Sequence, residues 1–275
     1  MKKKMRNPLW KRLPRELVGD IGKYLVIFLF MTATIGFVSG FLVADESMLE
    51  AYDESFEKYR IENGNFTLDS QATEEKLAEL EQEGVTIYEN FYLDEPVDVD
   101  LDGTSDGTMR IFKKREEVNL VCLMKGIFPE TADEIAIDRM YADNNSLAVG
   151  DTITVGGKEL KITGLVALSD YSALFSDPGD LMFDSVKFGV SVLTPEGFTA
   201  FPDTHMKYCY SWLYEKEPAD DTEEKEMADD FLEVLAAKTD ISGYLPGYLN
   251  QAIRFTGDDM GGDKAMVEVL LYILI

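Results

Sequence analysis

The stretch "YLVIFLFMTATIGFVSGFLVA", Tyr24–Ala44, decides how the rest of the chain is organised. It has 21 residues and no charged side chain, and twelve of them are Leu, Ile, Phe or Val. As a helix it would extend about 32 Å, which matches a bilayer core of about 30 Å. Those twelve side chains favour insertion by about −4 to −7 kcal/mol. The stretch therefore predicts a transmembrane helix over residues 24–44.

A cleaved signal peptide is the alternative interpretation of this stretch. Such a peptide has an apolar region of about 7–15 residues, followed by a site with small residues at two alternate positions. Here the apolar run is longer, and Val43-Ala44-Asp45 offers only one small residue of that pair. We therefore expect an anchor that stays in the chain.

Charge is distributed unevenly on the two sides of the stretch. Residues 1–23 carry eight of the 26 Lys and Arg but only two of the 52 Asp and Glu, which leaves 18 basic and 50 acidic residues for the rest. Because basic segments stay on the cytoplasmic side, we expect a basic cytoplasmic arm over 1–23 and an extracytoplasmic region from Asp45 onward, held at the cell membrane by contact with the lipid bilayer. An acidic region of this size repels a phosphate backbone, so nucleic acid is not an expected partner.

Residues 45–264 predict an extracytoplasmic domain of the α+β class, either as one body or as two lobes. Met48, Tyr52, Phe56 and Tyr59 recur at helical spacing, so the membrane helix should continue outward as a stalk. Beyond the stalk, strands and helices alternate. We expect strands over 65–69, 85–93, 109–114, 118–126 (buried), 188–193 and 208–214, helices over 72–84, 194–201 and 220–239, an exposed turn region over 94–108, and a hairpin at Gly156-Gly157.

No motif predicts catalysis or cofactor binding. A phosphate-binding loop would need Gly at 152 and Ser or Thr at 159, where the chain has Thr152 and Glu159. One histidine, His205, and two scattered cysteines cannot supply the three or four nitrogen and sulfur ligands that zinc sites use. We therefore predict no catalytic, cofactor-binding or metal residues, and no enzyme.

Two features stay open at the level of sequence. Asp98, Asp100 and Asp102 precede Gly103 in the spacing of half a calcium loop, but the twelfth position, where a Glu should close it, is Met109. A solvated acidic turn is the favoured interpretation, and a weak calcium site stays an alternative. Cys122 and Cys209 can form a disulfide or remain buried thiols.

Two aromatic segments, 88–93 and 243–255, could form either a binding surface or part of the core. Tyr, Phe and Leu at these spacings are what strands usually bury, so core packing is the favoured interpretation.

The segment from Gly126 to Phe175 resembles the FtsX-like permeases of MacB-type ABC transporters. The resemblance lies in a recurrent pattern, G-x-x-P, E-I-x-I, A, x-G-D-x-I and x-V-x-G, preceded by a basic arm and one span. The matching residues are Gly126, Pro129, Glu134-Ile135-Ala136-Ile137, Ala142, Val149-Gly150-Asp151 and Ile162-Thr163-Gly164.

The resemblance implies a fold like the MacB-type periplasmic core domain, placed between the first and second spans of a permease subunit. It also implies a cytoplasmic ABC ATPase as partner and a second permease half or a second copy of the chain. In that family, ATP-driven movement is relayed through the spans to the outer domain, which is called mechanotransmission. The cargo of such a permease is not encoded in any motif here.

The final stretch "MVEVLLYILI", Met266–Ile275, has two interpretations. Alone it would suit a C-terminal strand; after a span and an outer domain it is better interpreted as the start of a second transmembrane helix over 265–275, cut short. A single-anchor sensor or receptor, or a membrane-anchored enzyme, are the rival functions. Reading the coding sequence past Ile275 separates them, because only a permease continues through further spans.

Overall fold

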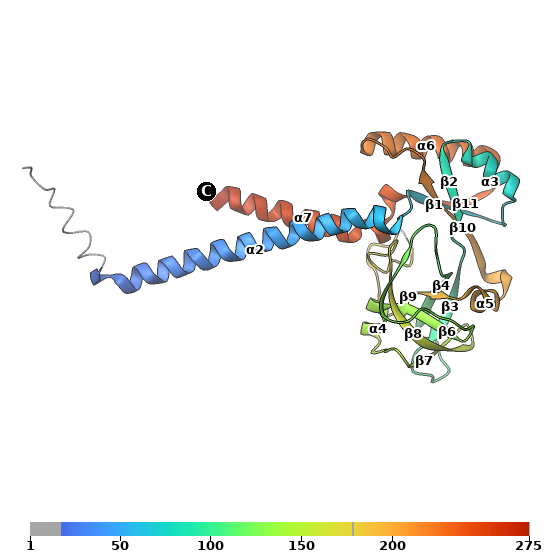
Figure 1. The fold of residues 1–275 in the computed structure, drawn as a ribbon, viewed down its shortest axis with the longest axis horizontal. Coiled ribbons are helices and arrows are strands. Elements are labelled where there is room, and N and C mark those ends of the chain that lie inside the picture. Colours follow the sequence, from blue (N-terminus) through green and yellow to red (C-terminus); the bar gives the residue numbers. More distant parts are fainter. Residues whose placement is uncertain (1–17, 178, 275) are drawn as a thin grey trace, which may run out of the picture. The chain divides into compact units, whose positions relative to one another are not determined.

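The computed structural model describes residues 18–177 and 179–274, so most of the predicted basic arm lies outside the described residues. In chain order the elements are α2 (Ile21–Tyr59), β1 (Gly64–Leu68), α3 (Glu74–Glu81), β2 (Val85–Glu89), β3 (Tyr92–Asp98), β4 (Gly107–Lys113), β5 (Val121–Gly126), β6 (Glu134–Asp138), α4 (Arg139–Asn144), β7 (Thr152–Val155), β8 (Lys158–Leu168), β9 (Phe188–Leu193), α5 (Pro195–Thr199), η1 (Asp203–His205), β10 (Met206–Tyr214), α6 (Asp221–Lys238), β11 (Ile241–Pro246), η2 (Gly247–Leu249) and α7 (Gln251–Leu274). Figure 1 shows their arrangement.

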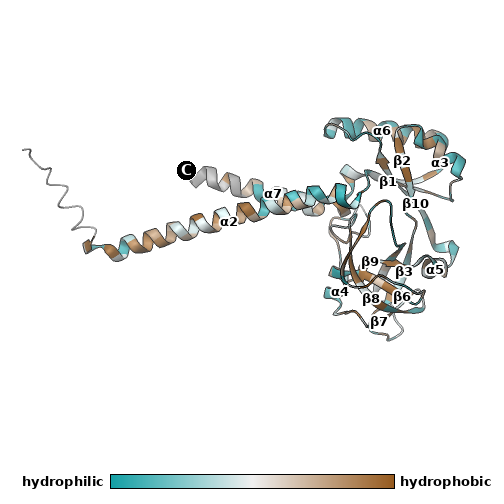
Figure 2. Cartoon of the chain, in the orientation of Figure 1, coloured by the Kyte–Doolittle hydropathy of each residue, from teal (hydrophilic) through white to brown (hydrophobic). Residues whose placement is uncertain are grey.

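Helix α2 contains the predicted span and the predicted stalk in one uninterrupted helix of 39 residues. Most of its large apolar side chains from Ile21 to Val43 are exposed. Figure 2 shows this part of α2 as a mostly hydrophobic stretch that gives way to hydrophilic residues toward Tyr59. Among the described residues, α2 is the helix that is long and apolar enough to cross a membrane. Exposed apolar surface of this extent is typical of a helix that contacts a membrane or a partner protein.

Residues Tyr52–Asp259 form a compact unit of their own. In one part of it, β1 lies between β10 and β11, and β2 continues the sheet on the other edge of β10, all antiparallel. Figure 1 shows α3 and α6 beside these strands. Phe231 of α6 meets Trp212 and Phe66 edge-on, so the buried face of the helix closes an aromatic core. The first two residues of β10, Met206 and Lys207, pair with β3 instead.

The remaining strands close on themselves. Pairing runs from β3 to β4, β9, β6, β8 and β7, and β7 returns to β3 through Val97 and Val155. A closed ring of strands leaves no edge within the ring, and its side chains fill the interior. Met109, Ile135, Ile153 and Val190 are among the side chains there that have no exposed surface.

The structure confirms most of the predicted elements and corrects three. The predicted strand over 85–93 is two strands, because the chain leaves one sheet and enters the other at Asn90 and Phe91. The predicted turn over 94–108 begins as strand, since β3 reaches Asp98. The predicted buried strand over 118–126 is an edge strand, β5, in which Met124 is 53% exposed.

The C-terminal segment is helical, so the interpretation of Met266–Ile275 as a strand is wrong for the residues that are described. Helix α7 begins at Gln251 and continues to Leu274. A second membrane crossing and a division of 45–264 into two lobes stay predictions.

Two backbone segments pass close to each other at Gly126, in the G-x-x-P element, and at Gly164, in the x-V-x-G element. Gly126 has φ +79°, and a Cβ there would lie 2.2 Å from the carbonyl oxygen of Thr163; a Cβ on Gly164 would lie 2.4 Å from the carbonyl oxygen of Ile127. Backbone occupies the space on both sides, so neither position accommodates a side chain. These residues of the pattern thus serve the packing of β5 on β8.

We predict that Gly164→Ala destabilises the folded unit by about 1–3 kcal/mol, because the new methyl group meets backbone rather than a movable side chain. Chemical unfolding followed by tryptophan fluorescence measures this loss. The matched control is Gly243→Ala on β11, where the nearest atom to a new Cβ is 3.6 Å away on Thr67. Its stability should stay within about 0.5 kcal/mol of the unmodified chain. Equal stabilities for the two variants would contradict the prediction.

Candidate functional site

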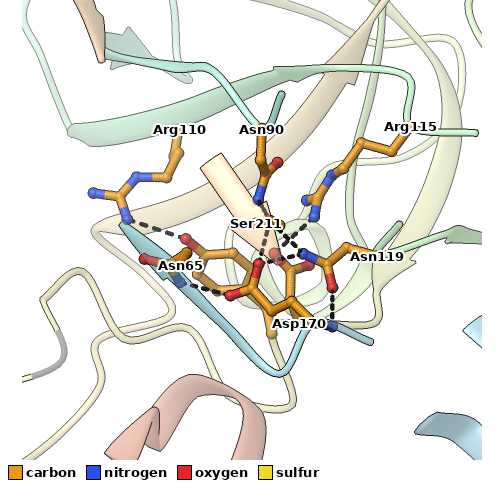
Figure 3. A network of polar contacts seen from close by, with 9 residues as sticks. Asn65, Asn90, Arg110, Arg115, Asn119, Asp170 and Ser211 are labelled. Carbon is orange, nitrogen blue, oxygen red and sulfur yellow. Dashed lines mark hydrogen bonds and ion pairs between the residues drawn. The ribbon is translucent and has the colours of Figure 1, made fainter. Parts of the chain in front are cut away.

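Six buried polar residues meet at the centre of the unit Tyr52–Asp259. We name them the polar cluster: Glu62, Asn90, Arg115, Asn119, Asp170 and Ser211, each no more than 8% exposed. They come from six separate places in the chain, between α2 and β1, between β2 and β3, after β4, before β5, after β8 and within β10. Figure 3 shows Asn90, Arg115, Asn119, Asp170 and Ser211 converging from these different elements. Buried polar groups on this scale need nearly complete hydrogen bonding to be tolerated.

Glu62 receives hydrogen bonds from neutral groups only. Asn65 donates Nδ2–H to Oε1 at 2.6 Å, Asn119 donates Nδ2–H to Oε2 at 2.7 Å, and the Ser211 hydroxyl donates to Oε2. Within the described residues no Lys or Arg nitrogen lies within salt-bridge distance of Glu62. Burial raises the pKa of the Glu62 carboxyl group and the negative charge of Asp170 raises it further, while the three hydrogen bonds oppose the shift.

Arg115 and Asp170 form the one ion pair of the cluster. The Nη1 atom of Arg115 lies 2.7 Å from Oδ2 of Asp170, and the two side chains are 5% and 6% exposed. The guanidinium carbon also lies 4.2 Å from the ring centroid of Phe112, which adds a cation–π contact. Since both charges have left water, each depends on the other to remain buried.

A cavity of about 510 Å³ opens beside the polar cluster. Glu62, Asn90 and Asp170 line it on one side, and five aromatic side chains form other parts of its wall, namely Tyr92, Phe112, Tyr171, Phe175 and Tyr244. This volume is within the range of small-molecule sites. The combination of apolar walls and a few buried polar groups is also typical of such sites.

Arg110 lies in the same wall with its charge already neutralised. It makes a two-point contact with Asp94, at 2.7 Å from Nε and 2.8 Å from Nη2, and also donates to the Tyr171 hydroxyl and the Ser176 carbonyl. A guanidinium held on several sides keeps one position. Arg110 therefore acts as a fixed part of the cavity wall.

The end of α2 is tied to the polar cluster through backbone. The amide N–H groups of Asn119 and Leu120 donate to the carbonyls of Arg60 and Tyr59, at 3.0 and 2.8 Å. The Glu62 amide donates in turn to Oδ1 of Asn119 at 2.9 Å. A shift of the last turn of α2 must consequently move Asn119 and Glu62.

The start of α7 is tied to the segment that carries Asp170. Ser172 donates to the Ala252 carbonyl from its amide at 2.6 Å and from its hydroxyl at 2.8 Å. Tyr52 of α2 donates its hydroxyl to the carbonyl of Ile253 at 3.0 Å. The first turn of α7 and the last turns of α2 thus meet the cluster within one folded unit.

The acidic loop predicted from sequence is closed by its own hydrogen bonds. Gly103 donates its amide to Asp98 at 2.8 Å, and Asp102 accepts from the amide and hydroxyl of Thr104. One oxygen each of Asp98, Asp100 and Asp106 lies within 4.8 Å of the others, so the third converging carboxylate is Asp106 rather than Asp102. Hydrogen bonds of this kind are typical of a solvated acidic turn.

The other sequence candidates lie elsewhere. Cys122 and Cys209 are both free thiols, and burial raises the pKa of Cys209 to about 12, which keeps it protonated. His205 contacts Glu95 through Nδ1 at 2.6 Å. Gly156 and Gly157 form the predicted hairpin turn with φ +56° and +78°, which confirms the prediction for the region that superficially resembles a phosphate-binding loop.

Sequence reasoning placed no site residue in the polar cluster. Two of its members, Asn90 in "YENFYL" and Asn119 in "VNLVCL", are amides beside apolar residues, whereas Arg115 lies in the charged run "KKREE". A polar amide in the middle of a strand-like run is a weak signal, because such residues also end strands. Their common function is visible only after the sheet pairing has brought them together.

Neither a protein-family profile nor a curated protein matches the chain in sequence. Among solved structures, the periplasmic region of MacB from Actinobacillus actinomycetemcomitans is similar at a TM-score of 0.39 and 11% identity, over 74% of this chain and 98% of that one. The extracellular domain of the noncanonic ABC-type transporter YknZ from Gram-positive bacteria is similar at 0.35 and 13% identity, over 65% of this chain and 96% of that one. At TM-scores below 0.5, such overlaps are too loose to assign the fold or the activity of this chain.

We predict that Asp170→Asn destabilises the unit by about 3–5 kcal/mol, because it leaves the guanidinium of Arg115 buried without an anion. Chemical unfolding of the chain in detergent measures the loss. The double variant Arg115→Met with Asp170→Asn removes both charges and should lose less than the single variant. A single variant within about 1 kcal/mol of the unmodified chain would show that the pair is dispensable.

We also predict that Glu62 makes stability depend on pH. Its pKa is raised above 4.5 in the folded state, so the folded state keeps a proton that the unfolded state has already released. The contribution of Glu62 to stability is then fully present below its unfolded pKa and is lost as pH rises through its folded pKa. Relative to the non-titrating variant Glu62→Gln, the unmodified chain should lose stability over that window. Unfolding of both at a series of pH values tests this, and a difference that stays constant or grows with pH would refute it.

Proposed function

We propose that the chain is the permease subunit of an ABC transporter, whose outer unit is moved by ATP-driven displacement of its membrane helices. The observation that carries the proposal is the continuity of α2: one helix contains a 21-residue uncharged stretch and ends at the polar cluster. Helices transmit axial and rotational displacement with little loss, since each residue is fixed by its backbone hydrogen bonds.

Attachment of α7 to the same region supports the proposal. A Cβ on Gly257 would lie 2.5 Å from the ring of Tyr52, so the two helices approach each other closely where they enter the unit. Displacement of α2 against α7 would act on two connected segments, Tyr59–Glu62 and Asp170–Ser172. The hydrogen bonds of the polar cluster depend on one another, so the cluster has a few discrete conformations rather than a continuous range of them. A mechanical relay requires such discrete conformations.

The resemblance of Gly126–Phe175 to FtsX-like permeases supports the same function. It supplies the finer parts of the proposal: a cytoplasmic ABC ATPase partner, a basic arm on the cytoplasmic side, an outer domain outside the membrane, and pairing with a second permease half or a second copy. It also supplies mechanotransmission as the mode of action. The cargo exported, extracted or regulated is left open by both the sequence and the site.

A single-anchor receptor is the second candidate, and one specific observation favours it. The cavity of about 510 Å³ beside the polar cluster is a site of the size and lining that small ligands use. A receptor would couple occupation of this cavity to α2 through Glu62. The two functions differ in the direction of the signal, from the membrane outward in a permease and from the cavity inward in a receptor.

The test is purification of the full chain from its native membrane, followed by hydrogen exchange with and without ATP. We expect an ATPase subunit to co-purify, and ATP to change amide exchange in segments 60–65 and 170–173. Ala51→Pro should abolish that change, because proline removes a backbone bond and breaks α2 on an exposed position. Ala51→Gln, which keeps the helix, should retain it.

The folded unit itself should be unaffected by Ala51→Pro, so its unfolding midpoint serves as the control for misfolding. Absence of any ATPase partner, or ATP-dependent exchange that survives Ala51→Pro unchanged, would reject the relay. A response to ligand without ATP would favour the receptor instead.

A further inference from the structure

Two neighbouring apolar side chains in the connection between β8 and β9 are almost fully exposed. Leu181 is 94% exposed and Met182 is 82% exposed, and we name this pair the apolar tip. The next residue, Phe183, is partly buried, with its ring centroid 5.5 Å from that of Phe175 and 5.2 Å from that of Phe255, both edge-on. Aromatic contacts of this geometry favour one placement of the ring. The apolar tip is therefore held against the unit Tyr52–Asp259 while its own two side chains stay exposed.

Hydrogen bonds order the connection on both sides of the apolar tip. On one side, Oδ2 of Asp180 accepts from the hydroxyl of Ser176 at 2.7 Å. On the other side, Oδ1 of Asp184 accepts from the amide of Val186 at 3.1 Å. These carboxylates are engaged by donors of the connection itself. The exposure of the apolar tip is thus a property of a hydrogen-bonded turn, and two adjacent side chains this exposed are more than the scattered apolar residues of an ordinary surface.

The apolar tip lies at the end of the unit from which both long helices leave it. Leu181 lines a cavity of about 280 Å³ together with Asp258 and Asp259 of α7, and the unit ends at Asp259. A Cβ on Gly257 would lie 2.5 Å from the ring of Tyr52, which is the first residue of the unit on α2. Leu181 is therefore close to the points where α2 and α7 pass out of the unit.

A short piece of helix connects this end of the unit to the predicted span. Residues 45–51 belong to α2, and Tyr52 comes eight positions after Ala44, which is about 12 Å at the helical rise. The lipid headgroups occupy about 5–7 Å of that distance, since they make up the difference between the full bilayer and its hydrocarbon core. Apolar side chains at this end of the unit are thus within reach of the bilayer surface.

Charge around the apolar tip indicates which lipid surface it fits. Residues 176–186 contain three Asp and no Lys or Arg, and Asp258 and Asp259 of α7 lie beside Leu181. Basic residues are what draw interfacial segments to anionic lipids. A contact made here must therefore come from the apolar side chains alone, and anionic lipid should oppose it.

We propose that the apolar tip inserts Leu181 and Met182 into the headgroup–acyl boundary of the extracytoplasmic leaflet, as a second contact of the unit with the bilayer besides α2, and that it prefers zwitterionic lipid. Two separate contacts restrict the tilt of the unit on the membrane. The proposal rests on α2 as the membrane anchor, which the permease and the receptor share, and it needs neither an ATPase nor a ligand.

The test measures the depth of a nitroxide spin label in the full chain, reconstituted in phosphatidylcholine nanodiscs. Cys122→Ser removes the partly exposed thiol, and Cys209 stays unlabelled because it is buried and its pKa is raised to about 12. Met182→Cys then carries the label. Collisions with oxygen, which concentrates in lipid, are compared with collisions with a water-soluble nickel chelate. We expect oxygen to dominate, at a depth like that of other interfacial apolar groups, about 5–10 Å into the boundary.

The matched control is the same label on Ala236→Cys, an exposed position of α6 next to Lys238, which pairs with Glu79 and Glu83. There we expect the nickel chelate to dominate. Adding Leu181→Ser to the chain labelled at position 182 should raise its nickel access toward that of the control. The unfolding midpoint should not change, because Leu181 is exposed in the folded unit. Equal nickel access at positions 182 and 236 in the chain with Leu181 intact would overturn the proposal.

Lipid composition separates an apolar contact from an electrostatic one. Replacing part of the phosphatidylcholine with phosphatidylglycerol should raise nickel access at position 182, because the carboxylates near the apolar tip are repelled by anionic headgroups. Deeper insertion with phosphatidylglycerol would contradict the proposal. A label shielded from both oxygen and nickel would also contradict it, and would assign the apolar tip to a protein partner, or to a second copy of the chain if the spectra show spin–spin broadening.

A third label distinguishes failure of this contact from failure of the anchor. Thr34→Cys places the label in the middle of the predicted span, where oxygen access should be highest. An inserted label at position 34 combined with a nickel-accessible label at position 182 would reject the contact and leave the anchor standing. A label at position 34 that meets the nickel chelate freely would reject both.

Discussion

Glu62 is a carboxylate that has left water almost completely, and it is held by three neutral donors from three different parts of the chain. Removing an ion from water costs several kcal/mol unless hydrogen bonds and charges replace the solvent. That cost dictates the surroundings: Asn65 must follow directly in β1, Asn119 must turn back toward α2, and Ser211 must face inward from β10. Without one of these donors the buried carboxylate would lack a hydrogen bond. A shift of one sheet against the other is therefore unfavourable.

The same requirement links the cluster to the helices. Asn119 adopts φ +49°, a left-handed conformation, and in it serves both Glu62 and the last turn of α2. Asparagine tolerates this conformation better than most residues. On the other side, Asp170 is fixed by Arg115 and precedes Ser172, which binds the first turn of α7. Helix ends, ion pair and cavity wall are therefore parts of one hydrogen-bonded assembly.

The residues that carry the resemblance to FtsX-like permeases have a structural function. Gly126 and Gly164 allow two backbones to cross, and Glu134 accepts from the amides of Glu130 and Thr131 to close the turn before β6. These contacts hold β5 against β8 and shape the turn before β6. Most residues that line the cavity lie outside the patterned segment.

The sequence by itself determined the long apolar helix and its stalk, the hairpin at Gly156-Gly157 and most strands, because these depend on the identity of neighbours within a few positions. The helix predicted over 194–201 is present as α5, and the hydroxyl of Thr194 caps it by accepting from the Gly197 amide. Only the tertiary structure decided that 85–93 breaks into two strands at Asn90, that β5 lies at an edge, and that Glu62, Asn90 and Asp170 share one cavity. The physical reason is range: helical and turn preferences act over a few residues, whereas a buried charge selects its partners from across the whole fold.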